Sequence, residues 1–145
     1  MDNLIIRVPK TEDAEDINRI LKAITRAPDG LDIQQTIDEQ SGRGTVASLV
    51  AEIDGRVVGY LISYILSGGF GIDKSAWIAM LGVDPKFMGK GIGKCMAKEI
   101  LRFYREQGIA NIFTSVPWDS TDLLSFFKTL GFDRSNFINL KKVLE

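Results

Sequence analysis

Apolar residues recur along this chain with the spacing of strands and helices, and they predict six strands and four helices. Short apolar runs rich in β-branched residues, bounded by turn residues, predict strands at residues 4–8, 46–53, 56–66, 75–83, 109–116 and 136–143. Apolar residues at helical spacing predict helices at residues 11–26, 92–107 and 120–130, and a weaker one at 32–40. Thr11 is the expected N-cap of the first helix.

The order of these elements predicts an α/β fold with a mixed, mostly antiparallel sheet of six to seven strands and helices on both faces. Asp54-Gly55 separates two strands by two residues, which is a strong hairpin signal. The run at residues 75–83 is apolar throughout, so it is expected in the middle of the sheet, covered on both sides.

Composition bounds the class of protein. The chain has 145 residues, 45% of them hydrophobic and 26% charged, so one folded domain over residues 1–145 is expected. The net charge of −1 argues against generic nucleic-acid binding. No apolar run approaches the length of a membrane span, and the first residues do not form a signal peptide, so a cytoplasmic location without membrane contact is expected.

The absence of histidine removes several chemistries. Ser-His-Asp and Cys-His catalysis are excluded, as is a metal held by imidazole. Cys95 is the only cysteine, so the chain has no internal disulfide and no thiolate zinc site. No metal is therefore expected.

A glycine-rich turn carries the strongest chemical signal. Gly89, Gly91 and Gly93 alternate between a predicted strand and the start of a predicted helix. The first turn of a helix presents unpaired N–H groups, and glycine lets a phosphate approach them closely. Lys90 and Lys94 add positive charge, so the turn predicts a site for a diphosphate.

Spacing separates the cofactors that use such a turn. A P-loop would place Gly where Met88 stands and Ser or Thr where Cys95 stands. The dinucleotide fingerprint would require glycine at Lys94 or at Met96. Neither pattern fits.

What remains resembles the GNAT superfamily of acyl-coenzyme A-dependent N-acyltransferases. The family motif, Q/R-x-x-G-x-G/A at the start of a helix, is matched by Met88-Gly89-Lys90-Gly91-Ile92-Gly93. Three further segments resemble the family's first strand and helix, its third strand and its late helix, in the family's order. They are Ile6-Arg7 with Glu12-Asp13-Ala14, then Val57-Val58-Gly59-Tyr60, and finally Phe126-Phe127-Lys128-Thr129-Leu130-Gly131-Phe132.

The resemblance implies a coenzyme A site. The fourth and fifth strands would splay apart, the turn would hold the pyrophosphate, and the backbone of the fourth strand would pair with the pantetheine arm. The cofactor-binding residues that it implies are Leu81, Val83, Met88, Gly89, Lys90, Gly91, Ile92, Gly93, Lys94, Ser120 and Phe127.

It also implies transfer of an acetyl group from acetyl-CoA to a primary amine, by direct attack in a ternary complex. The acceptor stays open between a protein lysine, a protein N-terminus and a small amine. An N–H near Leu81 would stabilise the oxyanion. Trp77 and Ser115 stand where relatives often carry an acidic base, which leaves Asp119 as the first candidate. Asp122, Asp73, Glu52 and a water chain are the alternatives.

Some positions depart from the family pattern. Met88 replaces Gln or Arg, and Ser120 stands where an asparagine often contacts the cofactor. Phe127 replaces a tyrosine that often protonates the leaving thiolate, and a phenyl ring cannot donate a proton. An inactive acyl-CoA-binding or regulatory module is therefore the alternative, and a nucleotide-binding domain of another kind is a third hypothesis. A homodimer also stays open.

Overall fold

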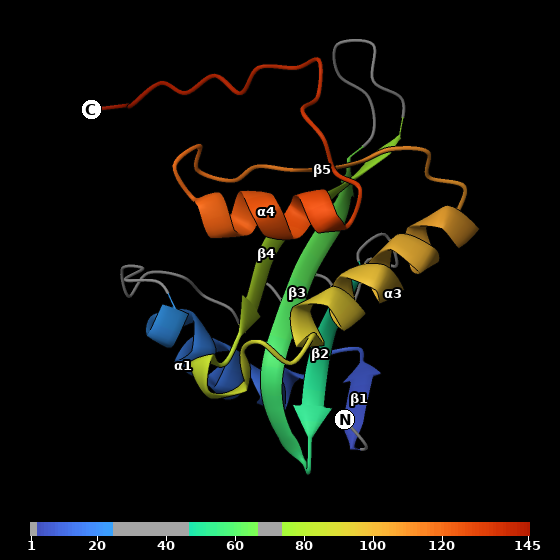
Figure 1. The fold of residues 1–145 in the computed structure, drawn as a ribbon, viewed down its shortest axis with the longest axis vertical. Coiled ribbons are helices and arrows are strands. Elements are labelled where there is room, and N and C mark those ends of the chain that lie inside the picture. The colour runs from blue at the N-terminus through green and yellow to red at the C-terminus, as the bar shows by residue number, and fades with distance from the viewer. Residues whose placement is uncertain (1–2, 25–46, 67–73) are drawn as a thin grey trace.

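The computed structural model describes residues 3–24, 47–66 and 74–145, and the expected helix at residues 32–40 lies outside them. Figure 1 shows how the strands and helices are arranged. The strands are β1 (Leu4–Arg7), β2 (Ser48–Ile53), β3 (Arg56–Leu66), β4 (Ser75–Val83) and β5 (Ile112–Thr114). The helices are α1 (Ala14–Ile24), α3 (Ile92–Glu106) and α4 (Thr121–Thr129), with short 3-10 turns η1 (Thr11–Asp13) and η2 (Pro85–Phe87).

The described strands form one mixed sheet in the order β1-β2-β3-β4-β5. The first four are antiparallel neighbours, and β5 runs parallel to β4. Asp54 and Gly55 turn β2 into β3 with φ angles of 51° and 82°, so the expected hairpin is confirmed. The predicted α/β class and mixed sheet are thus confirmed.

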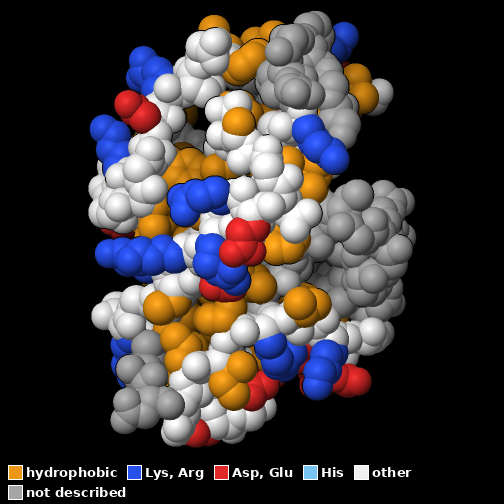
Figure 2. All heavy atoms as spheres, turned by 90° about the vertical axis from the view of Figure 1, so that its right-hand side faces the viewer, with side chains coloured by type: hydrophobic (Ala, Val, Ile, Leu, Met, Phe, Trp, Pro, Cys, Tyr) orange, Lys and Arg blue, Asp and Glu red, His pale blue; other side chains and the backbone are white. Residues whose placement is uncertain are grey.

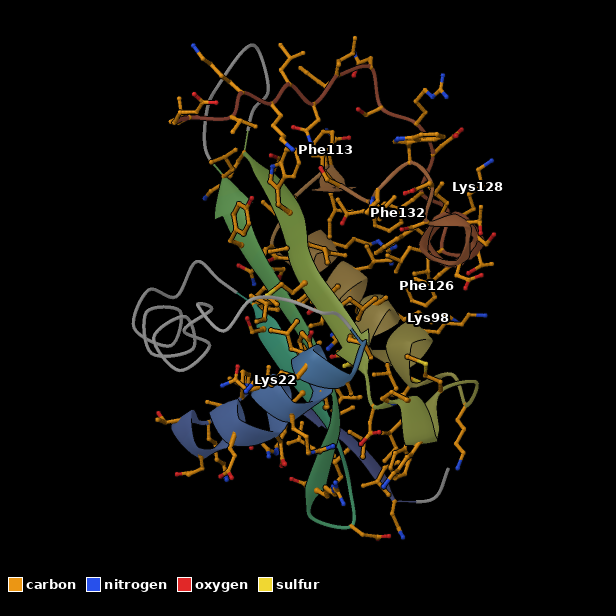
Figure 3. The ribbon with its side chains drawn as sticks, turned by 90° about the vertical axis from the view of Figure 1, so that its left-hand side faces the viewer. Lys22, Lys98, Phe113, Phe126, Lys128 and Phe132 are labelled. Atoms are coloured by element: carbon orange, nitrogen blue, oxygen red, sulfur yellow. The ribbon has the colours of Figure 1, made fainter. Side chains whose placement is uncertain are left out.

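Helices cover both faces of the sheet, as predicted. Figure 3 shows α1 on one side of the strands and α3 and α4 on the other. Ile17 and Ile20 of α1 pack with Tyr60 of β3 in one core cluster, whereas Met96 and Ile100 of α3 belong to the second, larger cluster. The alternation of side chains along the strands supplies both faces with apolar groups.

A buried side-chain hydrogen bond joins the sheet to α3. Ser63 of β3 and Tyr104 of α3 have hydroxyl oxygens 2.7 Å apart in the buried interior.

At the first helix, the expected N-cap at Thr11 is wrong by one residue. Lys10 is the cap position, and its N–H donates to the Asp13 carboxylate at 2.6 Å, because that carboxylate is held there by Arg7.

The prediction of six to seven strands is wrong for the described residues, which contain five. Residues 136–143 form no strand, and the run expected at 109–116 shortens to Ile112–Thr114. A strand needs a neighbour for its backbone, and β5 is too short to template another one. Phe137 reaches the ring of Phe113, but Ile138 and Leu140 stay more than four-fifths exposed.

Basic side chains on the face in Figure 2 occur in separate groups, interspersed with apolar and acidic ones. On α3, Arg102 pairs with both Glu99 and Glu106 of the same helix. Charge on this face is therefore balanced locally and does not form one continuous basic surface.

Candidate functional site

The glycine-rich turn leads directly into α3. Gly89 and Gly91 have φ angles of 80° and 81°, a conformation that side chains with a β-carbon rarely adopt. Gly91 is the N-cap residue, and the first backbone hydrogen bond of the helix runs from Cys95 N–H to Gly91 O at 3.0 Å. Within the described part of the chain, the amides of residues 89–94 have no hydrogen-bond acceptor. They lie at the positive end of a helix, where Gly89, Lys90, Gly91 and Lys94 are exposed while Ile92 is 1% exposed.

The lysines of this turn lie at its surface. Lys90 and Lys94 are exposed, and neither forms an ion pair with a described residue. The Lys90 ammonium lies 5.4 Å from the centre of the Phe87 ring, which holds it beside the turn. Met88 is 53% exposed and contributes no charge at the motif position where it stands.

Leu81 and Val83, near the end of β4, direct their backbone N–H and C=O groups away from the neighbouring strand β3. Asp84 N–H donates to Val58 O of β3 at 2.8 Å, which makes this a hydrogen-bonded pair of the antiparallel ladder. Bonded and non-bonded pairs alternate along such a ladder. Val83 and Leu81 therefore occupy non-bonded positions, and their N–H and C=O groups face away from β3.

No described strand takes up these outward groups. The β4–β5 ladder spans three residue pairs and ends where Ile78 lies opposite Thr114. Ala79, next along β4, is an extra residue, because Ile78 pairs with Ser63 and Met80 with Ile62. Such a bulge bends a strand and increases its twist, and here it coincides with the end of the pairing. The second half of β4 thus carries free donors and acceptors that lead toward the turn.

Phe126 of α4 borders this region. A β-carbon built at Gly93 would stand 3.5 Å from two atoms of the Phe126 ring and 3.7 Å from a methyl group of Val83. The three residues therefore bring α3, α4 and β4 together. The family resemblance implied the neighbouring residue, Phe127, for the cofactor site; only the angular position of each ring on α4 separates the two.

The sequence model of the acetyltransferase (GNAT) family matches residues 14–132, which includes the turn, the strand and both helices just described. The chain belongs to the GNAT acetyltransferase family. It is therefore an acyltransferase, and the predicted family and enzyme class are confirmed.

Solved GNAT structures share the fold over nearly their whole length. An aminoglycoside acetyltransferase from an uncultured soil metagenomic sample has a TM-score of 0.83 at 20% identity, covering 99% of this chain and 98% of that one. An aminoglycoside N-acetyltransferase in complex with CoA has a TM-score of 0.81 at 18% identity, with coverages of 97% and 94%. A ribosomal-protein-alanine N-acetyltransferase from Brucella melitensis has a TM-score of 0.77 at 17% identity, with coverages of 98% and 99%.

Phe127 is a buried residue of this GNAT domain. It is 6% exposed, and its ring packs edge-on against Phe126 and Phe132, with centroids 5.2 and 5.1 Å away. Figure 3 shows Phe126 and Phe132 on the side of the sheet that carries α3 and α4. Phe127 is the buried anchor of α4, so the structure gives its ring a packing role in the core.

The predicted polar residues lie at the start of α4. Ser120 is the N-cap residue, and its side chain makes no capping hydrogen bond. Asp119 is exposed on the turn before it. Both positions leave their oxygen atoms accessible, and Asp122 is exposed in the first turn of the helix.

The other candidates for the base are distributed differently. Glu52 accepts a hydrogen bond from Arg7 at 3.0 Å, on the β1–β2 side of the sheet, which separates it from the free half of β4. Asp73 lies outside the described residues. Trp77 stacks on Phe113, with ring centroids 4.8 Å apart, just before the β4–β5 pairing ends.

Among the described residues, no group of three or more His, Cys, Asp or Glu side chains converges to ligate an ion. Within the same residues, none of the helices has the length and apolar character to span a bilayer.

Proposed function

We propose that this GNAT domain transfers an acetyl group from acetyl-CoA to a primary amine by direct attack in a ternary complex. One observation carries the proposal: the amides at the head of α3 without a described acceptor lie beside the outward backbone groups of β4, since Gly93 and Val83 approach each other there. A diphosphate joined to an extended amide chain matches this path from the turn to β4, and coenzyme A has this chemistry.

Each part of the site takes one part of the cofactor. The amides of residues 89–94 bind the pyrophosphate, with Lys90 and Lys94 adding charge. Leu81 and Val83 pair with the amides of the pantetheine arm as a further strand would, where β5 has diverged. Phe126 lines this path in addition to the predicted residues, and Ser120 offers its hydroxyl from the start of α4.

The reaction then needs little from the protein besides placement. The amine nitrogen bonds to the thioester carbon, and an N–H group near Leu81 stabilises the developing oxyanion. Asp119 or a bound water takes the proton that the amine loses. The departing thiolate takes a proton from water, because the Phe127 ring has none to give.

The acceptor is a primary amine whose carrier stays open. The similar structures are of aminoglycoside and of ribosomal-protein acetyltransferases, so closely related folds act on chemically different amines. A cytoplasmic location is part of the proposal, since the exposed thiol of Cys95 suits a reducing compartment.

Glycine substitutions at the two ends of α3 test the cofactor site. Gly91 and Gly108 have φ angles of 81° and 78°, and a β-carbon at either would meet no other atom within 4 Å. Gly91→Glu and Gly108→Glu therefore carry the same backbone strain, but only the first puts a carboxylate at the pyrophosphate amides. Calorimetric titration with acetyl-CoA should show binding lost in Gly91→Glu and kept in Gly108→Glu. Equal affinities would refute the assignment.

Turnover is tested separately. Release of free thiol from acetyl-CoA in the presence of a panel of primary amines, namely peptides with free N-termini, lysine peptides, aminoglycosides and small amines, should exceed the rate without an amine. Binding of acetyl-CoA without turnover of any acceptor would favour the second candidate, a non-catalytic acyl-CoA-binding module.

The observation that favours this second candidate is the buried phenyl ring of Phe127. In Phe127→Tyr, a rise in kcat by an order of magnitude would show that acid catalysis limits the natural protein. An unchanged kcat, in a variant that still binds acetyl-CoA, would show that thiolate protonation is not limiting.

A further inference from the structure

An ion pair links α1 to the end of β4. Arg19 Nη1 donates to Asp84 Oδ2 at 2.8 Å. Arg19 Nη2 also donates to the carbonyl oxygen of Val57 at 3.1 Å, and it lies 3.4 Å from Asp16 Oδ1 on its own helix. One guanidinium therefore joins the helix on one face of the sheet to the ends of two central strands, β3 and β4.

Asp84 uses each of its polar atoms at this junction. Its N–H donates to Val58 O, and its carbonyl oxygen accepts from Phe87 N–H at 2.8 Å. Its side chain accepts from Lys86 N–H at 3.0 Å through Oδ1, and from Arg19 through Oδ2. Asp84 is 4% exposed, so this arrangement is shielded from water.

The pair stands at the entrance to the glycine-rich turn. Asp84 follows Val83 directly, and the 3-10 turn that it caps, η2, leads through Met88 to Gly89. The carboxylate thus orients η2 relative to the outward backbone of β4. None of the hydrogen bonds of Asp84 to described residues involves the amides of residues 89–94.

Burial and charge decide how strongly the pair holds. Burial raises the pKa of Asp84, but hydrogen bonds from Arg19 and from Lys86 N–H, with the charges of Arg19 and Arg56, outweigh it, and the net pKa lies below its ordinary value. The side chain is therefore an anion held by fixed donors. Removing either side chain leaves hydrogen-bonding groups of the other without a partner, at the junction that orients η2.

We propose that Arg19 and Asp84 act as one positioning unit for the coenzyme A site, setting the glycine-rich turn at the angle at which its amides continue the edge of β4. This inference rests on the proposed function. Because neither side chain borders the free amides, the unit acts on the affinity for acetyl-CoA and leaves the chemical step and the acceptor site unchanged.

The test uses Asp84→Asn, Arg19→Gln and the double variant. Asparagine keeps an oxygen for Lys86 N–H while losing the charge that Arg19 meets. We expect the KM for acetyl-CoA and its calorimetric Kd to rise about tenfold in each single variant, less than the 10²-fold that a misplacement of about 1 Å can cost. The double variant should be no weaker than the singles, because both remove the same interaction.

Controls separate positioning from general loss of structure. Kinetics are measured below the unfolding transition of every variant, and kcat and the acceptor KM should stay within twofold of the unaltered protein. Arg102→Gln removes an exposed ion-pair partner on α3, 53% exposed in its side chain, and should leave all constants unchanged. If Asp84→Asn fails to fold, Arg19→Lys replaces it: lysine keeps the charge but not the fork that meets Asp84 and Val57 together, so the Kd should still rise.

Three outcomes would overturn the inference: unchanged Kd values with only a lower melting temperature, additive effects in the double variant, or a fall in kcat at constant KM. Failure of the unaltered protein to bind acetyl-CoA would overturn the proposed function as well. Normal binding by the unaltered protein and by all variants would remove the positioning role alone.

Discussion

Gly93 and Phe126 meet at the head of α3, where a β-carbon on the glycine would rest 3.5 Å from the phenyl ring. This is an ordinary contact distance, so the space beside Gly93 accepts a methyl group. Gly91, two residues earlier, has open space around it but a φ of 81°. The backbone conformation therefore requires glycine at position 91, whereas packing does not require it at position 93.

Alanine substitutions at Gly91 and Gly93 should have opposite effects on stability. Gly93→Ala adds a better helix former in the first turn and should raise the free energy of unfolding by about 0.5–1 kcal/mol. Gly91→Ala forces a β-carbon into the left-handed region and should lower it by about 1 kcal/mol. Urea denaturation of both variants measures the difference, and a shift of the same sign in both would contradict it.

Lys90 should contribute to coenzyme A binding through its charge. Lys90→Ala should weaken acetyl-CoA binding by about 1 kcal/mol at low ionic strength, and by less as salt screens the interaction. Calorimetric titrations at several salt concentrations provide the measurement. Lys141→Ala, on the exposed C-terminal segment, is the matched control. An unchanged salt dependence in Lys90→Ala would take Lys90 out of the site.

Acid should weaken the β1–α1 junction. Burial raises the pKa of Asp13, but hydrogen bonds from Arg7 and Lys10 N–H outweigh it and hold the net pKa below 3.8. A depressed carboxyl pKa stabilises the fold above the unfolded value, and this contribution is lost as pH falls below it. Stability should therefore decline from about pH 5 downward.

Arg7→Gln tests this junction. It should cost about 2 kcal/mol at neutral pH, less than a fully buried pair would, because Arg7 is 24% exposed in its side chain. The variant should also lose less stability on acidification, although Asp84 keeps its own share of that pH dependence. Urea denaturation over a range of pH measures both quantities, and parallel curves would contradict the expectation.

Alkaline pH should act on Tyr60. Burial raises the pKa of Tyr60 to about 12 from the ordinary value of 10.0, and its side chain is 1% exposed. Since the unfolded state loses this proton first, the free energy of unfolding should fall as pH rises from 10 to 12. Burial also raises the pKa of Tyr104, so ultraviolet titration should show more than one late-ionising tyrosine, and one late transition should disappear in Tyr60→Phe. Its persistence in that variant would reassign the transition.

The end of the chain should be dispensable up to a sharp limit. Ile138, Leu140 and Leu144 are at least 85% exposed, so deleting residues 138–145 should change the free energy of unfolding by less than about 0.5 kcal/mol. Deleting residues 132–145 also removes Phe132 from the Phe127 ring and should cost about 3 kcal/mol. A large loss in the shorter deletion would show that this segment pairs with another surface, such as a second copy.

Sequence periodicity predicted most of the fold because local and tertiary preferences agree there. The Asp54-Gly55 hairpin, α1, α3 and α4 all lie where their apolar patterns and breakers put them. The strand expected at residues 136–143 failed because strand propensity is realised only with a partner, and β5 is three residues long. The N-cap lies at Lys10, whose N–H donates to the Asp13 carboxylate that Arg7 also binds.

The sequence by itself determined the glycine-rich turn for which we propose anion binding in this GNAT domain, because glycine spacing and an adjoining helix start are local properties of the chain. It also excluded histidine chemistry. Only the tertiary structure decided which groups of β4 face outward, where the β4–β5 pairing ends, that Phe126 borders the path while Phe127 fills the core, and that Arg19 grips Asp84. Those facts depend on register and on contacts between residues as far apart in the chain as 19 and 84, which no local pattern encodes.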